Sequence, residues 1–143
     1  MKKELELQLV ERYPKIFAEY GGDMRETCMH WGMDCGDGWY DIIHHLCKYL
    51  QFQTDKNGWP QIVAAQVKEK FGGLRFYVNS GTDQQHTIID YVESMSYTIC
   101  ETCGTSQNVK AYHKGWRRTL CPSCNEKYLD YLKEKEQDVS EFT

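Results

Sequence analysis

The chain has 143 residues, a length that suits one globular domain or a small domain with a zinc-bound appendage. Its hydrophobic and charged contents, 41% and 27%, are those of an ordinary soluble protein and argue against disorder. The net charge of −4 is concentrated towards the N-terminus, where residues 1–60 carry 7 Lys/Arg against 10 Asp/Glu, and this acidity argues against a general attraction to nucleic acid.

The first residues, MKKELELQLVERY, place charges among leucines and contain no uninterrupted apolar segment. They therefore predict neither a signal peptide nor a membrane span. Seven cysteines, four of them in paired C-x2-C spacing, fit a reducing compartment and a metal site better than a disulfide framework. We therefore expect a cytoplasmic protein that does not bind a membrane.

Three helices are predicted in the front part of the chain, residues 1–99. They lie at about residues 3–12, 38–52 and 83–98. The second prediction is the most persuasive, because apolar residues recur at helical spacing between Trp39 and Leu50.

A β-hairpin is predicted at about residues 62–79, where apolar residues alternate on both sides of Gly72 and Gly73. On its first strand, Val63, Ala65 and Val67 are expected to face inward. The outward face would carry Lys68, Lys70, Arg75 and Tyr77, unless the register slips by one residue and exchanges the faces.

The loop CMHWGMDCGDGWY, residues 28–40, is a candidate recognition surface. Its glycines permit close backbone approach to a partner or ligand, and its aromatic rings offer flat faces for a planar group. Its carboxylates near a helix N-terminus oppose phosphate, which would have to be met by cations of the hairpin. The alternative is that the tryptophans are core and the glycines only turn the chain. The composite pocket would comprise Trp31, Asp37, Trp39, Tyr40, Lys68, Lys70, Arg75 and Tyr77.

Two cysteines of this loop and a histidine of the following predicted helix raise the hypothesis of a second zinc site, formed by Cys28, Cys35 and His44. The spacing between the two cysteines is wider than is usual in a zinc knuckle, so we expect a single zinc ion elsewhere in the chain.

The strongest pattern in the sequence is CETCG at residues 100–104 and CPSC at residues 121–124, separated by seventeen residues. Two such pairs complete the tetrahedral sulfur shell that zinc accepts, so Cys100, Cys103, Cys121 and Cys124 are predicted to bind one zinc ion. Because all four ligands come from the protein, no position remains for activated water, and the ion is expected to be structural.

These patterns together predict an α+β fold, with a small helical and β-hairpin front part followed by a C-terminal, treble-clef-like, four-cysteine zinc ribbon. The expected boundaries are a recognition domain at residues 1–99, a zinc-ribbon module at residues 100–135 and a frayed tail at residues 136–143.

The most basic stretch of the chain, KAYHKGWRR at residues 110–118, lies between the two cysteine pairs and contains no acid. One interpretation is nucleic-acid binding through phosphate contacts and ring stacking. The other is a solvated hairpin face that balances the negative charge of a zinc tetrathiolate. The candidates for nucleic-acid binding are Lys110, Lys114, Trp116, Arg117 and Arg118.

Three stretches, WGMDCGDGWYDII, VKEKFGGLRFYV and the terminal CETCG…LCPSC, together resemble a group of small, largely uncharacterised proteins encoded by bacteriophages and prophages. The resemblance covers roughly residues 24–128 and implies no catalytic residues. It implies a context, because small phage accessory proteins commonly block a host factor or capture a nucleotide signal used in defence.

Our first hypothesis is therefore a non-enzymatic, zinc-stabilised accessory protein that binds a small nucleotide-like ligand in the host cytoplasm. One alternative is an inhibitor that binds a host protein through exposed tryptophans. Another is a nucleic-acid-binding zinc ribbon, and an unrecognised hydrolase or nuclease is the enzymatic alternative. The sequence leaves open whether the protein forms a homo-oligomer.

Overall fold

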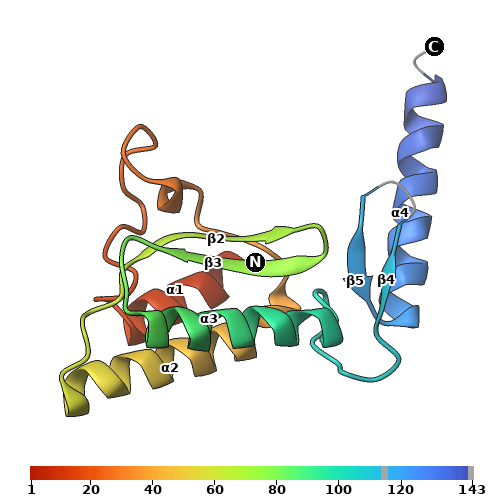
Figure 1. Cartoon of the computed structure of the whole chain (residues 1–143). Coiled ribbons are helices and arrows are strands. Elements are labelled where there is room, and N and C mark those ends of the chain that lie inside the picture. The colour runs from red at the N-terminus through yellow and green to blue at the C-terminus, as the bar shows by residue number, and fades with distance from the viewer. Residues whose placement is uncertain (114–115, 142–143) are drawn as a thin grey trace.

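The computed structural model describes residues 1–113 and 116–141. In the front part, the helices α1 (Lys3–Arg12), α2 (Tyr40–Asn57) and α3 (Asp83–Met95) lie on one side of a three-stranded sheet (Figure 1). The front core forms between these layers from apolar residues that are almost completely buried, among them Leu9, Ile43 and Phe76. The mixture of helices and small sheets confirms the predicted α+β class.

The sheet of the front part has the order β1–β2–β3. Strand β1 (Met33–Asp34) runs parallel to β2 (Ala64–Lys70), and β2 pairs antiparallel with β3 (Gly73–Val78). A two-residue turn joins β2 to β3, with positive φ angles of 52° at Phe71 and 81° at Gly72. Positive φ at both central residues is typical of the turn that matches the twist of a hairpin, which explains why glycine follows Phe71.

The register places Val67 opposite Phe76 on the buried face and Lys68 opposite Arg75 on the outer face. A β-bulge between Ala64 and Gln66 shifts this register, so that Ala64, and not Ala65, is fully buried. The expected inward alternation of Val63, Ala65 and Val67 is therefore wrong before the bulge, because one extra residue exchanges the two faces of a strand.

Helix α2 is longer than predicted, whereas α3 and the short 3-10 helix after it together span the predicted residues 83–98. Helix α2 continues to Asn57 and stops where Gly58 adopts a left-handed conformation, with its amide bonded to the carbonyl of Thr54 at 3.2 Å. Helix α3 begins with a capping box formed by Thr82 and Gln85, and a short 3-10 helix, η3 (Ser96–Thr98), extends it.

The free edge of β3 is covered by α3 and η3. The backbone N–H of Leu74 donates to Ser96 Oγ at 2.9 Å, and that of Phe76 donates to Glu93 Oε2 at 2.7 Å. Burial raises the pKa of Glu93. These two acceptors satisfy backbone groups that would otherwise be open to pairing with another strand.

The C-terminal module consists of a two-stranded sheet and a long helix. Strands β4 (Lys110–Tyr112) and β5 (Arg118–Leu120) are antiparallel, and α4 (Pro122–Glu141) follows them. The order of cysteine knuckle, hairpin and helix is the predicted treble-clef-like arrangement. Helix α4 extends well beyond the two strands and reaches Glu141, so the expected frayed tail from residue 136 is helical as far as that residue (Figure 1). None of the helices described is long and apolar enough to span a membrane.

A candidate metal centre and its junction with the front part

The four predicted cysteine ligands converge in the C-terminal module. The sulfur atoms of Cys100, Cys103, Cys121 and Cys124 all lie within 4.8 Å of one another, and those of Cys103 and Cys121 are 3.8 Å apart. A tetrahedral zinc site with Zn–S bonds of about 2.3 Å has sulfur–sulfur edges of about 3.8 Å. The cluster can therefore hold one metal ion, and its dimensions are consistent with one zinc.

Backbone N–H groups favour the thiolate form of Cys100, whereas burial and the neighbouring thiols raise the pKa of Cys124 to about 12, and the pKa of Cys103 is also raised. Burial acts to raise the pKa of the Cys100 thiol, but the N–H groups of Cys103, Cys121 and Thr102 outweigh burial and lower this pKa to about 7. The N–H of Cys124 also donates to the sulfur of Cys121 at 3.4 Å. Because the thiolate is the form that binds metal, the folded backbone prepares Cys100 for an ion, while Cys103 and Cys124 would release protons when the ion binds.

The hypothesis of a second metal site gains no support from the geometry. Cys28 is exposed, whereas Cys35 is buried and its pKa is raised to about 12 by that burial. The Nδ1 atom of His44 lies 2.9 Å from the hydroxyl of Tyr13. Within residues 1–113 and 116–141, the four cysteines of the C-terminal module form the one group of metal-ligand type.

The glycines of the loop at residues 28–40 pack against the cysteine knuckle. The N–H of Gly38 donates to the carbonyl of Glu101 at 2.7 Å, and the N–H of Gly36 donates to Glu101 Oε2 at 2.9 Å. A Cβ atom on Gly38 would lie 2.1 Å from the carbonyl oxygen of Cys100, and one on Gly36 would lie 2.3 Å from the carbonyl oxygen of Glu101. These positions require glycine, and the backbone they approach is the chain's own knuckle.

Trp39 is fully buried in the front core, and its indole N–H donates to the carbonyl of Ile99 at 3.0 Å. It therefore presents no face to a ligand, and the prediction that it stacks on one is wrong. A large ring with a satisfied N–H is typical of a core tryptophan, and here it anchors the residue before Cys100.

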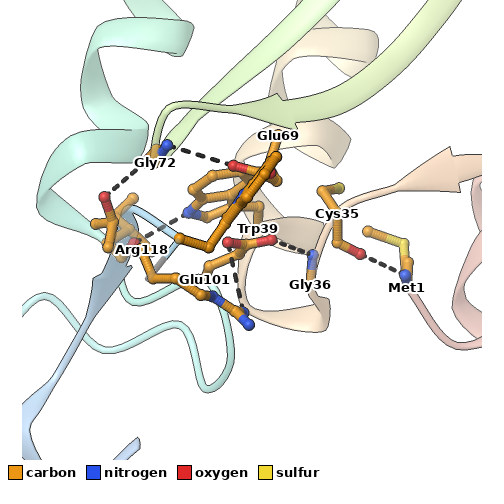
Figure 2. Close-up of polar contacts among 11 residues, drawn as sticks. Met1, Cys35, Gly36, Trp39, Glu69, Gly72, Glu101 and Arg118 are labelled. Atoms are coloured by element: carbon orange, nitrogen blue, oxygen red, sulfur yellow. Dashed lines mark hydrogen bonds and ion pairs between the residues drawn. The ribbon is translucent and has the colours of Figure 1, made fainter. Parts of the chain in front are cut away.

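The hairpin turn also contacts the C-terminal module. Thr119 Oγ1 donates to the carbonyl of Gly72 at 2.5 Å, and the indole N–H of Trp116 donates to Glu69 Oε1 at 2.8 Å. Figure 2 shows Gly72, Glu69, Glu101 and Gly36 gathered in this region. Residues 28–40, the hairpin turn and the segment with the two cysteine pairs thus meet at a single junction between the front part and the C-terminal module.

The other residues of the expected composite pocket fall into separate groups. Asp37 accepts a hydrogen bond from the backbone N–H of Lys2 at 2.7 Å, and the hydroxyl of Tyr40 donates to Gln8 at 3.1 Å, so both are tied to the region of α1. Trp31 is 68% exposed and lies edge-on to His30. The remaining candidates belong to the hairpin: Lys68, Arg75 and Tyr77 on the outer face of the sheet, and Lys70 with its ammonium 5.8 Å from the ring of Phe71.

Two candidates for nucleic-acid binding make contacts within the molecule. Trp116 bonds to Glu69, while Arg118 lies 3.7 Å from Glu101 Oε1 and 4.8 Å above the ring of Tyr128. Lys110 and Arg117 are exposed. Lys114 lies outside the described residues.

A pocket of about 300 Å³ opens at the junction. No sequence pattern marks this pocket, because its walls come from three segments that are far apart in the chain. The pocket, hereafter the junction pocket, is lined by Asp34, Cys35, Gly36, Glu69, Glu101, Trp116 and Arg118.

No protein-family model, curated protein or solved structure matches this chain.

Proposed function

We propose that the chain is a non-enzymatic accessory protein of the phage type that binds a small nucleotide-like ligand in the host cytoplasm. The ligand would lie on the outer face of the front sheet. A zinc ion on the four cysteines would stabilise the C-terminal module without taking part in chemistry, because the protein supplies all four ligands. Sequestration of a nucleotide signal used in host defence would be a function of this kind.

The observation that carries this proposal is the cross-strand pair of Lys68 and Arg75 on the outer face. Like charges directly opposite each other destabilise an antiparallel pair, and a bound anion would offset that cost. Asp34 is the other neighbour of Lys68 in the sheet, so this row across the three strands carries two cations and one acid. Charge complementarity therefore favours a phosphate group over these two side chains.

The same face offers a fixed guanidinium and an aromatic surface. Arg75 donates to the hydroxyl of Tyr97 at 3.1 Å, which holds the guanidinium in place and raises its pKa. Tyr77, two residues further along β3, is 40% exposed. If the phosphate of a nucleotide lay on Lys68 and Arg75, its base would lie on the same face of the sheet as the ring of Tyr77. Stacking between a base and an aromatic ring tolerates any base.

The test is a calorimetric titration of the zinc-loaded full chain with AMP, ADP and a cyclic dinucleotide. We expect at least one of them to bind, and Lys68→Ala and Arg75→Ala each to weaken binding about tenfold, as the loss of one charged contact predicts. Lys56→Ala, at the end of α2, is the matched control and should bind like the unmodified chain.

A stability measurement separates a binding role from a structural one. Because Lys68→Ala removes both a like-charge neighbour, Arg75, and an opposite-charge neighbour, Asp34, its thermal midpoint should be close to that of the unmodified chain. The proposal is overturned if none of the three nucleotides binds, or if both hairpin variants bind as tightly as the Lys56→Ala control.

A further inference from the structure

We propose that the junction pocket binds a guanidinium group, presented by an arginine side chain of a protein partner. This inference does not depend on a nucleotide-like ligand, because it concerns different residues and a different class of partner. It assigns a role to the place where the three sequence motifs meet.

The first observation is an unsatisfied carboxylate oxygen. Glu101 is only 3% exposed, and its Oε2 atom accepts the N–H of Gly36, whereas its Oε1 atom has no hydrogen-bond partner. The nearest nitrogen of Arg118 is 3.7 Å away, which is too long for a hydrogen bond. A buried acceptor without a donor is costly, so a ligand that brings an N–H group to this atom would be stabilised.

The second observation is the charge of the lining. The lining residues include three acids, Asp34, Glu69 and Glu101, and one arginine, Arg118, while the N-terminal ammonium group of Met1 donates to the carbonyl of Cys35 beside them, so acids outnumber cations by three to two. Four thiolates around a zinc ion would add two negative charges beside Glu101. The junction pocket therefore repels phosphates and carboxylates and favours a cation.

The kind of cation follows from the arrangement of the acids. The three carboxylates do not form a metal-binding group among the residues described. Both oxygens of Glu69 are already occupied, by the indole N–H of Trp116 and by the N–H of Gly72 at 3.3 Å. An organic cation that carries several separated N–H groups fits this lining better than a single metal ion does.

The third observation is the ring of Trp116, which is 64% exposed although its N–H is held by Glu69. A flat guanidinium can stack on an indole face and donate in its own plane at the same time, which an ammonium group cannot do. A free amino acid would bring its α-carboxylate towards the three acids. An arginine side chain within a polypeptide lacks that carboxylate, so a protein partner is the better source.

The experiment is an NMR titration of the ¹⁵N-labelled, zinc-loaded full chain with the peptide acetyl-Gly-Arg-Gly-amide. The reporters are the backbone amide of Gly36 and the indole N–H of Trp116. The same peptide with citrulline, a neutral group of nearly the same shape, and the same peptide with lysine are the matched probes. We expect saturable shifts with the arginine peptide, about tenfold weaker binding of the citrulline peptide, and weaker binding of the lysine peptide.

Variants locate the binding. Asp34→Asn and Trp116→Leu should each weaken binding of the arginine peptide several-fold, while Asp90→Asn, at another exposed acid, on α3, should not. Tyr77→Ala should also leave binding unchanged, which distinguishes the junction pocket from the outer sheet face. The proposal is overturned if the citrulline peptide or the lysine peptide binds as tightly as the arginine peptide. It is also overturned if neither Asp34→Asn nor Trp116→Leu changes the affinity for the arginine peptide. The absence of saturable shifts would mean that water alone satisfies Glu101 Oε1, and this would overturn it as well.

Discussion

Replacement of Gly38 by alanine tests whether the loop at residues 28–40 serves to dock the C-terminal module. The added Cβ atom would lie 2.1 Å from the carbonyl oxygen of Cys100 and 2.6 Å from the amide nitrogen of Gly104. Both atoms belong to the backbone of the cysteine knuckle, so neither can move aside as the end of a flexible side chain would. The loop must therefore separate from the knuckle.

The cost of this separation can be estimated from its two parts. Overpacking of a closely packed site costs about 1–3 kcal/mol, and loss of the hydrogen bond from Gly38 to Glu101 costs about 0.5–1.5 kcal/mol. Gly38→Ala should therefore lower the free energy of unfolding by about 1.5–4.5 kcal/mol. The control is Gly58→Ala, which meets no atom within 4 Å but has a φ of +70°, so it should cost only about 1–2 kcal/mol from backbone strain.

The assay is urea unfolding in the presence of zinc, followed by circular dichroism, with zinc release measured in parallel by a chelating dye. For a slope of about 2 kcal/mol per molar, Gly38→Ala should lower the urea midpoint by about 1–2 M and release zinc at a lower urea concentration. The explanation of the loop glycines is refuted if Gly38→Ala costs no more than Gly58→Ala and retains zinc equally well.

Three further predictions concern the cysteines and a buried acid. Cys103→Ser should lose the metal ion and the helicity of the C-terminal module, whereas Cys28→Ser should keep both. Metal analysis measures the first property and circular dichroism the second. Full metal content in Cys103→Ser would contradict the assignment of the four cysteines as ligands. Iodoacetamide should label Cys28 but not Cys47 in the folded, zinc-loaded chain, because burial raises the pKa of Cys47, and labelled Cys47 in a peptide mass map would speak against this. The carboxyl group of Glu93 should titrate above its ordinary pKa in a ¹³C NMR experiment, since burial raises that pKa. Because the folded chain then holds this proton more tightly than the unfolded chain, the contribution of Glu93 to stability should fall as pH rises from the ordinary pKa through the raised one; a midpoint at or below the ordinary value would contradict this.

Features that depend on local spacing could be predicted from the sequence. The apolar residues Ile42, Ile43, Leu46 and Leu50 recur along one helical face, and they are buried on one face of α2. The two C-x2-C pairs each hold their sulfur atoms close within one short turn, so their convergence required only that the two turns meet. The bulge in β2 could not be predicted from the sequence. It moves the buried position from Ala65 to Ala64, and two adjacent alanines give the same hydrophobic pattern in either register.

The roles of the loop residues could not be predicted, because they depend on contacts between distant segments. The sequence indicated that glycines at positions 36 and 38 permit a close approach, but Glu101, which they approach, lies 65 residues after Gly36. Trp39 could equally have been exposed or buried until the fold placed it beneath Ile99. Glu101 stands between two cysteines of the candidate metal centre, Cys100 and Cys103, and no sequence pattern marks its unsatisfied oxygen as part of a pocket.

Native mass spectrometry of the gently purified full chain tests the central claim most directly, that a single structural zinc ion on four cysteines organises the C-terminal module against the front part. We predict one zinc ion per chain, and its loss together with α4 helicity in the Cys103→Ser variant. A folded chain that carries no metal ion, or one that carries two zinc ions, would contradict this account.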